Sequence, residues 1–242
     1  IDHMRSFVDQ VYVPDTLAIA GFYKDWGMRG EGTGNFLTYG DFPEKGMDDP
    51  ASYLIPPGVI LDRDLSTIHE VDLHAADQIQ EYVSHSWYDY GAGKNAALHP
   101  YQGETSPRYS GPTSTYSNLN VDAEYSWLKS PRWKGNAMEV GPLSRVLMLY
   151  ATGNDQAKEL VNMTLSKLDV PVTALFSTLG RTAARTLETK VIADTMQTWY
   201  DNLIGNIKAG DTRTFNETLW EPSSWPKQCQ GVGFMEAPRG GL

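Results

Sequence analysis

The sequence predicts a mixed α and β fold, mainly helical, in which a long-helix bundle adjoins a loop-rich region of short strands. Apolar residues recur at helical spacing over residues 139–210, and short β-like runs broken by Gly and Pro occupy residues 27–72. The last predicted helix has about 36 residues and is apolar along its whole course. A helix of this kind usually belongs to a bundle, so we expect the chain to be part of a larger fold.

The 242 residues are interpreted as one fragment with six segments. We predict helices in 1–26, loops and short strands in 27–72, a helix in 73–90, an irregular stretch in 91–138, a helical bundle in 139–210, and a loop with an active-site strand in 211–242. The apolar stripe of the first helix begins at Ile1 without a capping residue. This start predicts that the ends are cuts.

The first segments contain signals for helix ends and turns. The opening helix is expected to end by Pro14, and Asp15 is a candidate cap for a second helix. Short strands are predicted at residues 36–39, 53–55 and 59–61. Pro57 and Gly58 suit the two central positions of a type II turn between the last two strands.

The middle of the chain combines one helical pattern with an irregular stretch. A single apolar face predicts an amphipathic helix over about residues 75–90. That face consists of Leu73, Ala76, Ile79, Val83, Trp87 and Tyr90. Residues 91–135 have little periodicity, but we expect them to be ordered because Trp127 and Trp133 need burial.

Residues 139–210 have clear start and stop signals. Pro142 fits the first position of a helix that Gly153 stops, and Asn154 or Asp155 caps the next one. From Leu175 to Gly210, apolar residues recur at spacings of three to five positions. This spacing predicts the long helix.

Charge and cysteine content restrict the partners. Lys and Arg number 20 against 30 Asp and Glu, giving a formal charge of −10 and a pI near 4.9. This charge argues against a nucleic-acid backbone or an anionic lipid surface as the main partner. No run approaches the roughly 20 apolar residues that span a bilayer. Cys229 is the single cysteine, and a free structural thiol is the favoured interpretation over a nucleophile or metal ligand.

Several clusters suggest chemistry only weakly. The cluster of His69, Glu70, Asp72, His74 and Asp77 has ligand types that suit a divalent metal, but its spacing favours a solvated polar turn. The glycines of residues 27–34 suggest a phosphate loop, yet a strand follows them where phosphate binding needs a helix, which favours a flexible loop.

Paired carboxylates make a sugar-active enzyme the second enzyme class. Asp48 with Asp49 and Asp62 with Asp64 are the candidate acid and base pairs.

Arginines on the long helix have two interpretations. Arg181 and Arg185 lie one turn apart beside Glu188, and a salt-bridge face is favoured over an anion site.

Three motifs in order carry a resemblance to a known family. They are Glu236-Ala-Pro-Arg239-Gly, Lys129-Ser-Pro-Arg132 followed by Met138-Glu-Val-Gly-Pro-Leu143, and Ser177-Thr-Leu-Gly-Arg-Thr182. With them, essentially the whole chain resembles the large subunit of nickel-iron hydrogenases, and especially the membrane-associated uptake enzymes of bacteria.

The resemblance implies a heterodimer with an iron-sulfur small subunit, located in the periplasm and associated with the membrane through partner subunits. It also implies a nickel-iron centre with cyanide and carbon monoxide ligands, which the family holds by four cysteines of two CxxC motifs. Neither motif occurs here, so no metal ligand is assigned in this chain, and the remaining parts of the large subunit must supply them.

The site residues implied by the resemblance lie near the last residue. Ala237, Pro238 and Arg239 match residues that line the cyanide pocket, and Arg239 matches the catalytic arginine over the metals, where dihydrogen is cleaved. A guanidinium suits an anionic acceptor in a dry site. The proton acceptor is Arg239 or a metal-bound cysteine thiolate. Two alternatives remain: a salt bridge between Arg239 and Glu236 or another acid, and a non-catalytic scaffold or interface segment.

Overall fold

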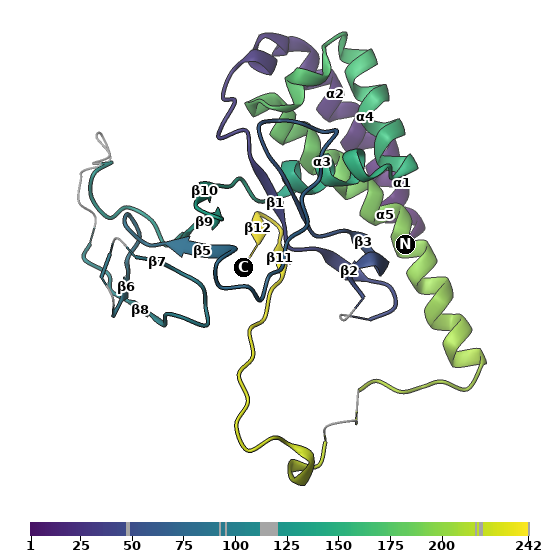
Figure 1. The fold of residues 1–242 in the computed structure, drawn as a ribbon. Coiled ribbons are helices and arrows are strands. Elements are labelled where there is room, and N and C mark those ends of the chain that lie inside the picture. The colour runs from purple at the N-terminus through teal and green to yellow at the C-terminus, as the bar shows by residue number, and fades with distance from the viewer. Residues whose placement is uncertain are drawn as a thin grey trace.

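The structure is a computed structural model and describes residues 1–46, 49–91, 93–94, 96–111, 121–215, 217 and 220–241. The helices gather into one group, and the short strands extend away from it (Figure 1). The helices are α1 (Asp2–Phe7), α2 (Val13–Phe22), α3 (Pro142–Thr152), α4 (Asp155–Leu168) and α5 (Thr178–Lys208). The mixed α and β class with short strands is confirmed.

The predicted limits of the first two bundle helices are confirmed, and the long helix begins later than predicted. Pro142 begins α3, and Gly153 ends it in the left-handed conformation, with a φ of 90°. Asn154 caps α4, where its side chain accepts a hydrogen bond from Ala157 N at 2.9 Å. The long helix α5 has 31 residues, because a 3₁₀ turn over Val172–Leu175 replaces its expected first turn and Ser177 caps it.

The expected break at Pro14 is wrong. A π-helical turn over Val8–Tyr12 joins α1 to α2, and Val13 N donates to Val8 O across this wider turn. Pro14 lies within the first turn of α2, where Asp15 makes no cap. A proline ring clashes with the carbonyl four residues earlier in a regular helix. The wider turn accommodates Pro14 without ending the helix.

Two strand pairs connect the bundle to the rest of the chain. All three predicted strands of residues 36–61 are present, and β1 pairs with β4 while β2 pairs with β3, all antiparallel. These strands are β1 (Phe36–Thr38), β2 (Asp41–Pro43), β3 (Tyr53–Ile55) and β4 (Gly58–Ile60). Phe36 and Ile60 pack into the core with α3 and α5, and Leu37 and Val59 pack into a second core with Ile79 and Trp133.

The predicted type II turn at Pro57 and Gly58 is wrong. Strands β3 and β4 pair with different partners, and Gly58 is not among the residues with positive φ. Glycine is needed at this position for a different reason. A Cβ there would lie 2.9 Å from Met148 Cε of α3.

The predicted helix over 73–90 is also wrong. This segment forms β5 (Ile79–Tyr82) and β6 (Tyr88–Tyr90), and β5 lies inside the four-stranded sheet of order β10-β9-β5-β7. Ile79 and Val83 are buried, as the pattern required. Residues four apart share a face in a strand as well as in a helix, so the spacing did not distinguish them. Antiparallel pairing with the distant β9 selects the strand.

The stretch from 91 to 138 is irregular, as predicted, with short strands. These are β7 (Ala97–Leu98), β8 (Thr105–Pro107), β9 (Ser130–Trp133) and β10 (Asn136–Ala137). Trp133 is buried, but Trp127 is 46% exposed and packs on the rings of Trp87 and Tyr109. The burial expected of Trp127 is therefore only partial.

The C-terminal segment returns to the centre of the molecule. After α5 it runs away from the bundle and comes back to form the antiparallel pair β11 (Glu236–Ala237) and β12 (Gly240–Gly241) beside β1 (Figure 1). The predicted loop and strand are confirmed, and the pair carries the Arg239 loop, which we define as residues 236–241.

Two glycines of α5 should respond oppositely to alanine. A Cβ at Gly180 would lie 2.0 Å from Leu175 O, whereas a Cβ at Gly205 would meet nothing within 4 Å. We expect Gly180→Ala to destabilise the full-length protein by roughly 2 kcal/mol or more. Gly205→Ala should stabilise it by up to about 1 kcal/mol. Denaturant unfolding of both variants measures the difference, and a neutral Gly180→Ala would contradict the close packing.

Candidate functional site

The turn that precedes α3 is the meeting point of three distant segments. Glu139 accepts two hydrogen bonds of 2.6 Å from Nε and Nη2 of Arg181 on α5. Its backbone N–H donates to Asn35 O at 2.8 Å, and its carbonyl accepts from Leu37 N at 2.9 Å. Ser144 Oγ donates to the same carbonyl at 2.7 Å. The start of α3 is thereby fixed to β1 and to α5.

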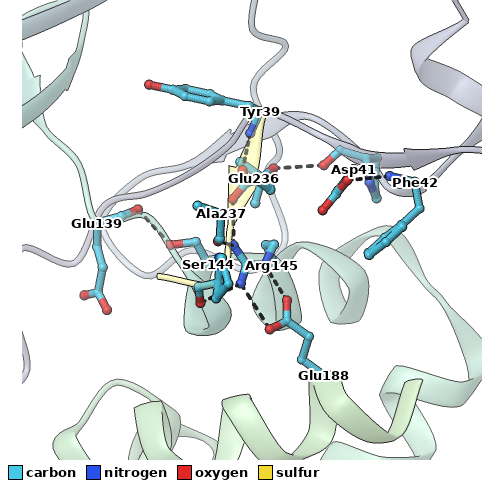
Figure 2. A network of polar contacts seen from close by, with 12 residues as sticks. Tyr39, Asp41, Phe42, Glu139, Ser144, Arg145, Glu188, Glu236 and Ala237 are labelled. Atoms are coloured by element: carbon cyan, nitrogen blue, oxygen red, sulfur yellow. Dashed lines mark hydrogen bonds and ion pairs between the residues drawn. The ribbon is translucent and has the colours of Figure 1, made fainter. Parts of the chain in front are cut away.

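Arg145 occupies the centre of the site, on the first turns of α3. Its side chain is only 4% exposed. Nε and Nη2 donate to the two carboxylate oxygens of Glu188 on α5, the second at 3.1 Å. Nη1 donates to Glu236 Oε2 at 2.7 Å (Figure 2). This arginine joins α3, α5 and the Arg239 loop through one guanidinium group.

The same guanidinium also reaches the backbone of the loop. Nη1 donates to Ala237 O at 3.0 Å, and Nη2 donates to Pro238 O at 3.3 Å. These two carbonyls directly precede Arg239 in the chain. The position of the loop backbone is therefore set from α3.

Glu236 ties the loop to β1 as well. Its side chain is 1% exposed, and Oε1 accepts a hydrogen bond from Tyr39 N at 2.6 Å. Because Glu236 binds Arg145 and Tyr39, the salt bridge considered between Glu236 and Arg239 does not form.

Glycines permit the loop to lie against its neighbours. A Cβ at Gly141, whose φ is 115°, would lie 2.5 Å from Arg239 O. A Cβ at Gly240 would lie 2.4 Å from Val140 Cγ2, and one at Gly241 would lie 2.4 Å from Tyr39 Cε2. Only glycine fits at these contacts, so the loop and the turn before α3 are in close backbone contact.

The three predicted site residues lie together at the tip of the loop. Pro238 and Arg239 are exposed, and Ala237 is half-buried. Arg239 borders two cavities, one of about 490 Å³ shared with Arg145 and Glu188, and one of about 630 Å³ shared with Tyr39 and Lys129. Among the described residues, none forms a hydrogen bond or ion pair with the guanidinium of Arg239.

The first cavity brings three carboxylates close to Arg145, and Arg185 and Arg239 are also among its lining residues. Glu236, Glu188 and Asp41 line it with Arg145. Burial raises the pKa of Glu236, and the hydrogen bonds from Tyr39 N–H and Arg145 offset this only in part. Burial also raises the pKa of Asp41. Burial lowers the pKa of Arg145, but its bonds to the two glutamates outweigh this and raise it, so the guanidinium stays charged.

The arginines of α5 confirm the salt-bridge interpretation in part. Arg181 pairs with Glu139, and its Nη1 donates to Gly30 O in the glycine-containing loop. Glu188 pairs with Arg145 across two helices rather than with its neighbours on α5. Arg185 is exposed at the edge of the first cavity.

The other candidate clusters do not converge on a site. Within the described part of the chain no three His, Cys, Asp or Glu side chains are placed to hold a metal ion. His69 packs on the ring of Trp133, and Asp72 accepts a hydrogen bond from His74 N at 2.9 Å, as in a polar turn. Cys229 is exposed.

The carboxylate pairs give no support to sugar chemistry. Asp62 and Asp64 are exposed, and Asp64 accepts hydrogen bonds from Ser66 within a turn. Asp48 lies outside the described residues.

Arg145 is the residue that sequence reasoning missed. It stands inside an apolar run of α3, Leu143 to Leu149, where a charged side chain needs a buried partner. That position was a signal, but the partners Glu188 and Glu236 lie 43 and 91 residues away. No local pattern identifies them.

Comparison with known proteins gives a consistent result. The family model described as nickel-dependent hydrogenase matches residues 1–242. The uptake hydrogenase large subunit of Rhizobium leguminosarum bv. viciae is 48% identical over 250 residues, covering 100% of this chain and 42% of the relative. The hydrogenase-1 large chain of Escherichia coli (strain K12) is 40% identical over 250 residues, with the same coverage of each.

Solved structures agree on the fold. The [NiFeSe]-hydrogenase of Dm. baculatum superposes with a TM-score of 0.68 at 28% identity, covering 98% of this chain and 43% of that chain. The Ni-Fe-Se hydrogenase from D. vulgaris Hildenborough gives a TM-score of 0.68 at 28% identity, covering 98% and 44%. The chain thus spans about 42% of the length of the curated relatives it matches.

The raised pKa of Glu236 predicts a pH-dependent stability. Its folded pKa exceeds the ordinary value of 4.5, so the folded state retains the proton longer than the unfolded state. The stability contributed in this way is present below the ordinary value and is lost as the pH rises through the raised pKa. We therefore expect the stability of the wild type relative to Glu236→Gln to fall as the pH rises from about 4 to 7.

Denaturant unfolding of both full-length proteins across this pH range measures the effect. Asp64→Asn is a control of opposite sign, because hydrogen bonds from Ser66 lower the pKa of the exposed Asp64. If the difference in unfolding free energy between the wild type and Glu236→Gln does not change with pH, the raised pKa of Glu236 would be contradicted.

Proposed function

Because this chain belongs to the nickel-dependent hydrogenase family, we propose that its complete subunit catalyses the reversible heterolytic cleavage of dihydrogen. Dihydrogen is split into a proton and a hydride, and the two electrons of the hydride pass to an iron-sulfur small subunit. The observation that carries the proposal is the guanidinium of Arg239, which pairs with none of the described residues and is held beside two cavities by a loop that is fixed from α3. The activity belongs to the complete subunit, since this chain spans about 42% of its relatives.

The donor set of the loop fits the ligands of a nickel-iron centre better than it fits a metal ion. A guanidinium has five N–H donors and no acceptor, so it suits an anionic nitrogen or oxygen. Within the described chain Arg239 has no carboxylate partner to use those donors. Cyanide ligands on the iron would be acceptors of this kind.

The metal ligands themselves come from segments outside this sequence. The described residues contain no cluster that could hold a metal, and the single cysteine, Cys229, is exposed and lies before the loop. This chain contributes the outer contacts to the centre, with Ala237 and Pro238 lining the cyanide pocket beside Arg239.

The residues of this chain would orient and polarise the ligands of the centre. When bound, the centre supplies the hydride-accepting redox chemistry. Arg239 would donate hydrogen bonds to the cyanide ligands and would place a positive charge beside them. A dry, low-dielectric site strengthens such contacts. Ala237 and Pro238 have no side-chain donors, so they would present apolar surface to the same ligands.

The proton from dihydrogen has two candidate acceptors. A charged guanidinium has five N–H donors and no acceptor atom, so it accepts a proton only after it has first lost one. The other acceptor is a metal-bound cysteine thiolate from a segment outside this sequence. Either group then passes the proton towards solvent.

The partners and location follow from the same proposal. Several relatives are uptake hydrogenases, and we infer that the complete protein works in the periplasm, associated with the membrane through partner subunits. In the part of the chain that the structure describes, no helix combines the length and apolar character that crossing a membrane requires.

A scaffold or interface role for the rest of this chain has one observation in its favour. Phe22 and Met28 are 86% and 85% exposed, and Trp26 lies between them. Apolar side chains exposed to this degree at the end of α2 are typical of a surface that another segment or subunit covers. This role is compatible with the catalytic one, because it concerns a different face.

The role of Arg239 predicts a specific loss of turnover. Lysine keeps the charge of Arg239 but lacks the planar fork that donates to two acceptors at once. In the complete metal-loaded enzyme, Arg239→Lys should retain nickel and iron and lower hydrogen oxidation by about two orders of magnitude or more. Hydrogen-dependent dye reduction and elemental analysis of the same preparation measure both quantities.

Arg213→Lys is the matched control. Arg213 is 78% exposed in its side chain and pairs with Asp211 on the surface, so its replacement should leave turnover unchanged. Near-normal turnover in Arg239→Lys would remove the catalytic assignment.

The absence of the two CxxC motifs from this sequence predicts no binding of nickel by the chain alone. Purified 242-residue chain, incubated with nickel and desalted, should contain far less than one nickel per chain by elemental analysis. The complete subunit from cells that make the metal centre is the positive control. Stoichiometric nickel in the isolated chain would refute the proposal that the ligands lie elsewhere.

A further inference from the structure

Arg145 uses every hydrogen-bond donor that its side chain has. A guanidinium has five N–H groups. Here they meet two oxygens of Glu188, one oxygen of Glu236, and the carbonyls of Ala237 and Pro238. A buried arginine with all of its donors satisfied has one stable orientation, because any rotation would leave a donor without an acceptor.

The two sides of the guanidinium bind different parts of the structure. Glu188, on the long helix α5, holds the Nε side of the group. The other side holds the Arg239 loop at three successive residues, through the carboxylate of Glu236 and the two carbonyls that follow it. Arg145 thereby transmits the position of the α3 and α5 pair to the backbone immediately before Arg239.

The burial of these groups makes the arrangement specific for arginine. The side chains of Arg145, Glu188 and Glu236 are 4%, 11% and 1% exposed. A lysine would keep one positive charge but offers three donors from a single nitrogen, too few for five acceptors that surround a planar group. Loss of the carbonyl contacts would remove the two hydrogen bonds that hold the backbone of Ala237 and Pro238, and the loop would keep only the contacts of Glu236 and its packing against Tyr39, Val140 and Gly141.

We propose that Arg145 is a positioning residue, which sets the orientation of Arg239 towards the iron-bound cyanide through the carbonyls of Ala237 and Pro238. This inference rests on the proposed function. It assigns to Arg145 no contact with the metals or with dihydrogen.

The test compares Arg145→Lys with wild type in the complete, metal-loaded enzyme. Hydrogen-deuterium exchange measures the amides of the Arg239 loop, and infrared spectroscopy measures the cyanide stretching bands. Loss of two hydrogen bonds to the loop should accelerate exchange in residues 236–241 about tenfold or more. The cyanide bands should shift in the same direction as in Arg239→Lys, which a purely structural weakening elsewhere would not produce.

Arg108→Lys is the matched control. Arg108 also bridges two carboxylates, Asp89 at 2.7 Å and Glu124 at 2.8 Å, but it lies near β8 and does not contact the Arg239 loop. Its replacement should leave both the loop exchange and the cyanide bands as in wild type.

A second variant covers the case in which Arg145→Lys does not fold. Glu188→Gln keeps Arg145 and removes one of its anchoring oxygens, so loop exchange should rise several-fold and the bands should shift by less. Wild-type exchange and unshifted bands in the folded variant would overturn the proposal.

The two assignments fail in different ways. Normal turnover in Arg239→Lys would remove the catalytic role of Arg239 and leave the exchange result for Arg145 unchanged. Unchanged exchange and bands in Arg145→Lys would remove the positioning role and leave the catalytic role of Arg239 standing.

Discussion

One buried guanidinium, that of Arg145, holds together the parts of the chain that form the site. It lies on α3, binds Glu188 on α5 and binds Glu236 and two carbonyls of the C-terminal loop. Removing one partner of such a buried network typically costs about 3–5 kcal/mol, because the remaining charges stay buried without compensation. The main effect of the network is therefore to restrict the loop to one position.

The close packing around this network needs both glycine and arginine. Glycines at 141, 240 and 241 let the loop backbone approach the start of α3 and Tyr39, and the arginine then fixes it there. The result is a cation, Arg239, at the edge of two cavities, whose donors bind none of the residues that the structure describes. A surface arginine would ordinarily find a carboxylate, but the nearest one in sequence, Glu236, is already occupied by Arg145 and Tyr39 N.

The sequence predicted those parts of the fold whose signals are local. Caps and breakers such as Asn154, Gly153 and Pro142 act within a few residues, so the bundle helices were placed correctly. The strand β5 was predicted as helix because residues four apart satisfy both periodicities, and only its pairing with β9, about fifty residues away, decides between them. Pro14 was expected to end a helix, but a π-helical turn accommodates it.

The same distinction between local and distant signals applies to the residues of the site. The arginine of the C-terminal loop was found through a motif of consecutive residues, whereas Arg145 was not, since its partners lie 43 and 91 residues away. A charged residue within an apolar helical run shows that a buried partner exists but does not say which one.

The most direct test of this account is a high-resolution crystal structure of the complete metal-loaded enzyme. We expect the Arg239 guanidinium to lie about 2.7–3.1 Å from the nitrogen of a cyanide ligand, with the carbonyls of Ala237 and Pro238 still bound by Arg145. A structure in which Arg239 instead forms a salt bridge with a carboxylate, away from the metal ligands, would contradict it.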